Sequence, residues 1–128
     1  MGSRPESIDP RKIVGLTAVS VMEIIDGEDQ AAALQVIFAD SSSVVCTVWT
    51  DWTLFIDRRS DAEIPDYFWP PEKHFRQLLI STPPGGAKIS SATPMIDEVG
   101  ETVGVDLKIG HQMVAARSLG GEIVITTS

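Results

Sequence analysis

The sequence predicts a small α+β domain: a mostly antiparallel β-sheet, made of an N-terminal meander and a C-terminal hairpin, with one main helix packed on it. Three observations predict this class. Apolar, β-branched segments broken by short turn signals occupy both ends of the chain. One ten-residue segment in the middle has helical spacing. The length of 128 residues suits one domain. We expect a flexible leader over residues 1–11 and a single α+β domain over residues 12–128.

The N-terminal meander is predicted from three consecutive segments. Residues 13–25 are rich in β-branched side chains and end at Asp26-Gly27, a strong turn signal. Residues 31–38 follow; their first half has helical propensity, but Val36-Ile37-Phe38 and the short turn favour a strand. A polar turn then leads into residues 44–57, which complete a strand–turn–strand–turn–strand meander.

Residues 44–57 carry the clearest period-two pattern in the chain. One edge is almost entirely apolar and is predicted to face the core: Val44, Cys46, Val48, Trp52, Leu54 and Ile56. The other edge mixes aromatic, polar and acidic side chains. This pattern is typical of one strand, or two strands across a bend, with one buried face and one partly hydrated face.

The middle of the chain supplies the predicted helix, over residues 72–81. Pro70-Pro71 suits a helix start, and Phe75, Leu78 and Leu79 would form the buried stripe. Thr82 to Gly86 would end it, and a short helical turn is predicted over residues 94–99. Residues 105–119 and 122–126, separated by Gly120-Gly121, predict the C-terminal hairpin. The sheet would thus have about five strands, counted by these patterns.

Composition limits the classes of partner. The chain has 18 acidic and 10 basic residues and a net charge of −8, so we expect it to bind neither nucleic acid nor membranes. Such a surface complements a basic partner instead. A single cysteine excludes an internal disulfide, and no secretory signal or membrane span is visible. We therefore expect a cytoplasmic location.

No catalytic or metal-binding motif is present. Cys46 lies between Val44 and Val48 on the apolar edge, where a buried thiol is unreactive. His74 and His111 are far apart in sequence, and no Cys pair, His-x-x-x-His or calcium-binding loop occurs. We predict no catalytic residue, no metal and no cofactor.

An aromatic group is the one constellation that points to binding. Trp49, Phe55 and Trp69 would fall on or beside the mixed face with Asp51, where the helix could cover them as part of the core. Alternatively they form a partner-binding patch, because tryptophan and adjacent charge dominate interface energetics. The predicted patch comprises Trp49, Asp51, Phe55, Asp57, Arg58, Arg59 and Trp69.

The order of elements resembles small uncharacterised bacterial domains and some immunity proteins of toxin–antitoxin and contact-dependent systems. The resemblance is carried by Leu34-Gln35-Val36-Ile37-Phe38-Ala39-Asp40, the turn at Ser41 to Ser43, and the following apolar strand over residues 44–49. It covers about 40 residues of pattern. It implies a bacterial protein-binding function and carries over no catalytic residue.

The function predicted from the sequence is a non-enzymatic, cytoplasmic protein-binding module, with an immunity-type inhibitor of a basic toxin as its specific form. Two alternatives stay open. One is a small-ligand-binding or catalytic protein with a sheet–helix cleft at Asp51, Trp49, Trp52 and His74. The other is a homo-oligomeric structural module that buries the aromatic face against its own copy.

Overall fold

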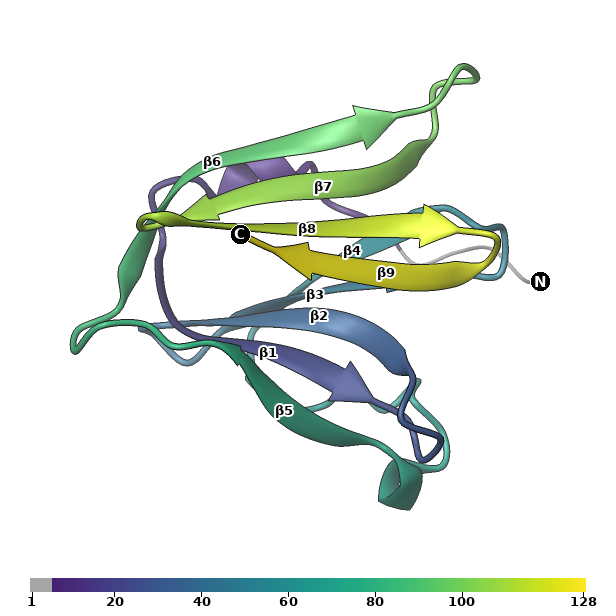
Figure 1. Ribbon diagram of the computed structural model, residues 1–128, viewed down its shortest axis with the longest axis horizontal. Coiled ribbons are helices and arrows are strands. Elements are labelled where there is room, and N and C mark those ends of the chain that lie inside the picture. Colours follow the sequence, from purple (N-terminus) through teal and green to yellow (C-terminus); the bar gives the residue numbers. More distant parts are fainter. Residues whose placement is uncertain (1–5) are drawn as a thin grey trace.

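Nine antiparallel strands make up the protein, as a computed structural model that describes residues 6–128 shows (Figure 1). The strands are β1 (Thr17–Ile25), β2 (Ala31–Phe38), β3 (Ser43–Val48), β4 (Leu54–Arg59), β5 (Phe75–Ile80), β6 (Ala87–Ile96), β7 (Thr102–Ile109), β8 (Gln112–Leu119) and β9 (Glu122–Thr127). Two 3-10 helices, η1 (Pro10–Ile13) and η2 (Pro71–Lys73), are the only helical segments of the described residues. The strand order is β4-β3-β2-β1-β6-β7-β8-β9, and β5 also pairs with β1.

The sheet divides at β1, because one edge of this strand serves two neighbours. Thr17 and Ala18 pair with β6, whereas the second half of β1 pairs with β5. Gly86 precedes β6 at the division, with φ +88°, and a Cβ there would stand 2.6 Å from the Ala18 carbonyl oxygen. Only glycine allows this close approach. In Figure 1 the β6–β9 part consequently lies over the part that contains β1, β2 and β5.

The main core lies between these two parts of the sheet. Strand β9 packs on β2 and β3, and β7 packs on β4. Alternate, mostly β-branched or leucine side chains meet there and are almost fully buried: Leu34, Val36, Val44, Leu54, Ile56, Val105, Leu107, Val114 and Ile123. Strand periodicity thus places one face of every hairpin in a shared apolar layer.

Four connections use the same five-residue turn. In each, the first amide donates to the fifth carbonyl, as from Asp26 to Gln30 at 3.0 Å and from Trp49 to Thr53 at 2.9 Å. The fourth residue has a positive φ in all four turns: Asp29 (61°), Ser41 (71°), Trp52 (68°) and Gly100 (86°). Tryptophan is unusual at such a position, which favours glycine or asparagine.

The predicted α+β class is wrong: the fold is all-β, and the predicted helix over residues 72–81 consists of η2 followed by strand β5. The spacing of Phe75, Leu78 and Leu79 suggested a buried helical stripe. In the structure, however, the second half of β1 offers an unpaired edge, and pairing with it outweighs this short helical pattern. Residues 75–78 are all exposed rather than buried on one side.

The predicted strands at both ends of the chain are present, but some of their bounds differ in the structure. The predicted meander corresponds to β1–β4, with residues 44–57 forming two strands. The prediction of residues 105–119 as one strand is wrong, because a turn at Gly110 divides them into β7 and β8, and β8 forms the hairpin with β9. The sheet therefore has nine strands rather than about five. The helical turn predicted over residues 94–99 is wrong, because β6 continues to Ile96 and a tight turn follows. Of the predicted leader, residues 1–5 lie outside the described residues. The Ile8 amide donates to the Ile56 carbonyl of β4 at 3.0 Å.

Candidate functional site

Residues 60–74, the crossing segment, run from β4 to β5, the two outer strands of the part of the sheet that contains β1–β5. Ile64 and Phe68 of this segment pack on Ile24, Ala33 and Val45 and form a second apolar cluster on the outer face. The crossing segment therefore covers the face that sequence analysis assigned to a helix.

The predicted aromatic patch lies partly beneath the crossing segment. Phe55 is 1% exposed, and the half-buried Trp49 ring makes edge contacts with Phe55 and Tyr67 at centroid distances of 5.0 and 5.6 Å. Edge-to-face geometry of this kind stabilises a core. Phe55 is thus unavailable to a partner.

The charged residues of the predicted patch form hydrogen bonds or a cation–π contact with other residues of the same chain. Asp57 Oδ2 accepts hydrogen bonds from Tyr67 Oη at 2.7 Å and from Arg59 Nη1 at 2.9 Å. Burial and this bond to Asp57 raise the pKa of Tyr67 far above its usual value. The Arg58 guanidinium lies 4.9 Å from the Phe38 ring centroid and donates to the Ser43 carbonyl. Asp51 Oδ1 accepts from the amide and hydroxyl of Thr53, which fixes the β3–β4 turn.

Two tryptophans are the most exposed large apolar side chains near this region. Trp69 is 78% exposed, and it precedes Pro70 through a cis peptide bond. Trp52 is 64% exposed, so its predicted place on the core-facing edge is wrong. The turn at residues 49–53 reverses the chain, and the two-residue alternation does not continue through it.

One end of the molecule, the turn end, gathers four hairpin turns. Figure 1 shows the β1–β2, β6–β7 and β8–β9 turns at this end. The β3–β4 turn joins them, because Ser118 Oγ of β8 donates to the Trp52 carbonyl at 2.6 Å. Within the turn segments, residues 26–30, 49–53, 97–101 and 119–122, there are eight acidic side chains and no lysine or arginine: Asp26, Glu28, Asp29, Asp51, Asp97, Glu98, Glu101 and Glu122. Two basic residues of other segments lie beside them, Lys73 against Gly27 and Arg11 in a hollow that Glu101 also lines.

A hollow of about 610 Å³ opens at this end beside Trp69; we call it the Trp69 hollow. Its walls are the β1–β2 turn and η2, which approach each other where Lys73 lies against Gly27. The lining residues include the acidic Asp26, Glu28 and Glu72, the basic Lys73 and the aromatic Trp69 and Phe75. Asp26 Oδ1 accepts from the backbone amides of Glu28 and Gln30 within its turn.

His74 also lines the Trp69 hollow, and its Nδ1 lies 2.9 Å from the Pro70 carbonyl oxygen. A carbonyl only accepts hydrogen bonds, so Nδ1 is the donor in this contact. The His74 ring stacks at a tilt on Phe68, with 5.5 Å between centroids.

The alternative constellation of Asp51, Trp49, Trp52 and His74 is not gathered in one cavity. Trp49 lines a separate hollow with Tyr67 and Phe68, and Trp52 lies against Gly121 of the β8–β9 turn. Cys46 is buried, and burial raises the pKa of its thiol to about 12, so it is not an activated nucleophile. Within residues 6–128, no three His, Cys, Asp or Glu side chains are grouped so that they could hold a metal ion.

Sequence reasoning missed the turn end. The acidic residues of the turns are visible in the sequence, but their convergence depends on which hairpin turns share an end of the sheet. Trp52 was assigned to the core by alternation alone. A signal for its exposure was available in the Asp51-Trp52-Thr53 segment, since aspartate and threonine commonly build turns.

Comparisons of the chain with protein-family models, with curated proteins and with solved structures gave no match. Among the described residues, no helix has the length and apolar character needed to span a membrane. The class that the structure supports is thus an all-β, antiparallel protein with an acidic turn end. Any function must be inferred from the geometry of that end.

Proposed function

We propose that this chain is a non-enzymatic protein-binding module that binds a basic protein through its turn end. The observation that carries the proposal is that four turns at one end of the molecule hold eight acidic side chains and no basic one, together with the exposed Trp52 and Trp69 near them. Opposite potentials accelerate association, and tryptophans surrounded by polar groups are frequent energetic centres of interfaces.

The turn end carries features that folding alone does not favour. Like charges gathered at one end repel each other. Trp52 combines a positive φ of 68° with exposure of most of its side chain, and a bulky residue in this conformation costs about 1 kcal/mol or more. Local departures from folding preferences concentrate at functional sites, which supports the assignment of this end to binding.

The proposal is tested by affinity capture on the immobilised full chain from a lysate of cells that encode it. The wild type is compared with a Trp52→Ser plus Trp69→Ser variant, and captured proteins are identified by mass spectrometry. A Val14→Ser plus Met113→Ser variant is the matched control, since both residues are exposed and neither belongs to the four turns. We expect a basic partner that is lost only from the first variant and that elutes as salt rises.

Equal recovery on all three columns, or a partner that is acidic and insensitive to salt, would contradict the proposal. The specific form predicted from sequence, an immunity-type inhibitor of a basic toxin in the bacterial cytoplasm, has its own test. Co-expression with the product of the neighbouring gene should relieve that product's toxicity in the wild type and not in the tryptophan variant. Unchanged toxicity would exclude this form.

A small-ligand site at His74 is the second candidate function, because His74 shares the Trp69 hollow with three carboxylates. A His74→Gln variant distinguishes the two. It should abolish small-ligand binding or turnover if His74 acts in chemistry, whereas Trp52→Ser, at a residue outside the Trp69 hollow, should weaken only the capture of a basic protein.

A further inference from the structure

We propose that the partner docks as an extended segment along the free edge of β5 and places a lysine or arginine side chain in the Trp69 hollow. This inference rests on the proposed function and specifies its recognition chemistry: an added β-strand that carries a cation. The partner is thus defined by an extended backbone and one basic anchor.

Strand β5 offers an open edge. Among the described strands it pairs only with β1, and Figure 1 shows it as the outermost strand of its part of the sheet. Phe75 and Leu78 are 46% and 55% exposed, and Gln77 is exposed as well. Exposed edges with apolar side chains are templates for strand addition.

Arg76, the charged residue of β5, does not protect the free edge of this strand from pairing. Arg76 Nη1 donates to the Ala62 carbonyl at 2.5 Å, and the same nitrogen lies 3.4 Å from Gln35 Oε1. The guanidinium is therefore bound to the crossing segment and to β2. A charged side chain protects an edge only when it projects where a new strand would pair.

Three other strands have a free edge: β4, β9 and the second half of β6, which pairs with β1 only through Ala87 and Lys88. On β4, the Ile8 amide donates to the Ile56 carbonyl, and the Ile56 amide donates to Ser7 Oγ at 2.8 Å, so residues 7 and 8 occupy part of that edge. Strand β9 packs across β2 and β3. This packing covers a face of β9 rather than its edge, so β5 is distinguished by its position beside the Trp69 hollow, which Phe75 lines.

The Trp69 hollow has the chemistry of a cation site. Its lining residues carry an excess of negative charge, with Asp26, Glu28 and Glu72 against Lys73, and they include the aromatic Trp69 and Phe75. Because Asp26 Oδ1 accepts from two backbone amides of its turn, we assign the cation to Glu28 and Glu72. Lysine and arginine are stabilised by both kinds of group, through charge-assisted hydrogen bonds and cation–π contact. A hollow of about 610 Å³ readily admits one such side chain.

Phe75 links the two parts of the site, because it lines the Trp69 hollow and is the first residue of β5. If a partner segment pairs along β5, the partner residue opposite Phe75 would therefore lie at the Trp69 hollow. Side chains that alternate along an added strand give such sites their specificity, while backbone bonds give affinity.

The cation preference is tested by titrating the labelled full chain with acetyl-arginine amide and with its neutral isostere acetyl-citrulline amide, at constant ionic strength. The readout is the NMR signal of the Trp69 indole N–H. We expect a shift with arginine only. A Glu28→Gln plus Glu72→Gln variant should bind about two- to fivefold more weakly for each carboxylate removed.

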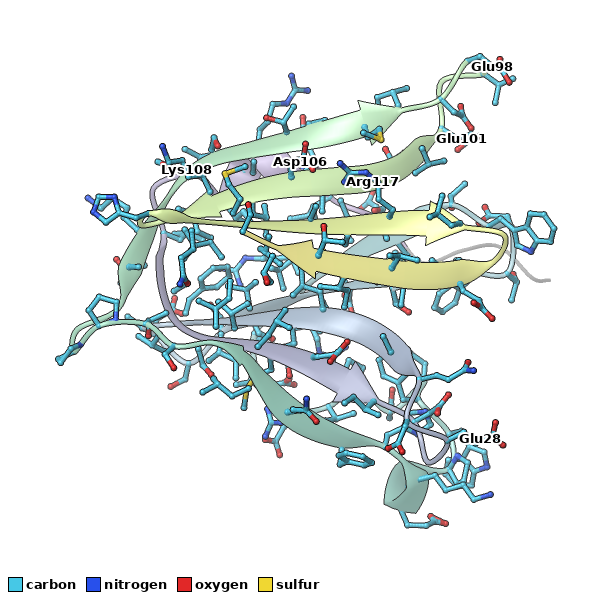
Figure 2. All side chains as sticks on the ribbon, viewed as in Figure 1. Glu28, Glu98, Glu101, Asp106, Lys108 and Arg117 are labelled. Atoms are coloured by element: carbon cyan, nitrogen blue, oxygen red, sulfur yellow. The ribbon has the colours of Figure 1, made fainter. Side chains whose placement is uncertain are left out.

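A Glu98→Gln plus Glu101→Gln variant is the matched control. It removes the same charge from the same end, but Figure 2 shows Glu98 and Glu101 on the β6–β7 turn, far from Glu28 on the β1–β2 turn. Its affinity for acetyl-arginine amide should equal that of the wild type. Equal responses to arginine and citrulline, or equal losses in both variants, overturn the cation site.

Strand docking is tested by selecting binders from a random linear peptide library on the immobilised full chain. Leu78→Lys should weaken binding of the selected peptides at least about tenfold, whereas Val124→Lys, which puts a lysine at an exposed apolar position of edge strand β9, should change it by no more than about twofold. We expect a basic residue in every strong peptide.

The outcomes separate the two proposals. Peptides that lack a basic residue, yet are lost with Leu78→Lys, overturn the cation anchor. Strand docking is overturned if the affinity of the selected peptides does not change with Leu78→Lys, or if the selection enriches no peptide. In each case the proposed function is tested separately, by the capture experiment with the Trp52→Ser plus Trp69→Ser variant.

Discussion

The phenolic hydroxyl of Tyr67 donates a 2.7 Å hydrogen bond to Oδ2 of Asp57 and thereby fastens the crossing segment to β4. The same carboxylate accepts from Arg59, whose guanidinium also reaches Asp61 at 3.3 Å. Tyr67 packs against Trp49 and Phe68 as well. This pair therefore joins the polar network and the aromatic group that cover the outer face.

Replacing Tyr67 by phenylalanine should lower the free energy of unfolding by about 1–2 kcal/mol, because the Asp57 carboxylate loses a donor while the ring packing is kept. Denaturant unfolding monitored by tryptophan fluorescence measures this change. A loss below about 0.3 kcal/mol would show that water replaces the hydroxyl without cost.

Alkaline pH should destabilise the fold. Burial and the bond to Asp57 raise the pKa of Tyr67 in the folded state above its unfolded value near 10, so its contribution is complete below that pH and is lost as pH rises. Tyr67 is the only tyrosine. Its phenolate absorbance should thus appear together with unfolding, and the Tyr67→Phe variant should be less sensitive to pH between about 9 and 11. A phenolate that forms while the fold stays intact would contradict this prediction.

Cys46 should be inert in the folded protein. Burial raises the pKa of its thiol to about 12, and the thiolate is the reactive form. A thiol-specific disulfide reagent at neutral pH should label the chain only after denaturation, with native labelling limited by the rate of unfolding. Rapid labelling that is first order in reagent would refute the buried position.

Gly86→Ala should cost at least about 3 kcal/mol or abolish folding, since a Cβ would meet the Ala18 carbonyl oxygen at 2.6 Å in a backbone with φ +88°. Gly85→Ala is the matched control, with φ +86° and no atom within 4 Å of the added Cβ. Its cost should be only about 1 kcal/mol. Thermal unfolding compares the two, and equal losses would contradict the role of close approach.

Trp52→Gly should leave the stability unchanged or raise it by up to about 1 kcal/mol, because glycine accepts the positive φ without strain. The same variant should weaken partner binding. Ser41→Gly, at the corresponding position of the β2–β3 turn, controls for the backbone effect. A loss of stability above about 1 kcal/mol would show instead that Trp52 is a structural residue.

The candidate site was only partly predictable. The aromatic group and the acidity are properties of the sequence, and they led to the expectation of a basic protein partner. Phe55 and Asp57, however, were assigned to a surface that the crossing segment covers, whereas Trp52 was assigned to the core. Alternation along a strand tells which residues share a face, but it cannot tell what covers that face.

By itself, the sequence determined where most strands and turns occur, since β-branched alternation and residues such as Asp26, Gly27 and Gly120 act locally. It also determined the charge and the buried character of Cys46. Only the tertiary structure decided that residues 75–80 form a strand, because the unpaired half of β1 supplies backbone partners that no local pattern reveals. The same long-range pairing brings four acidic turns to one end and leaves β5 as an open edge.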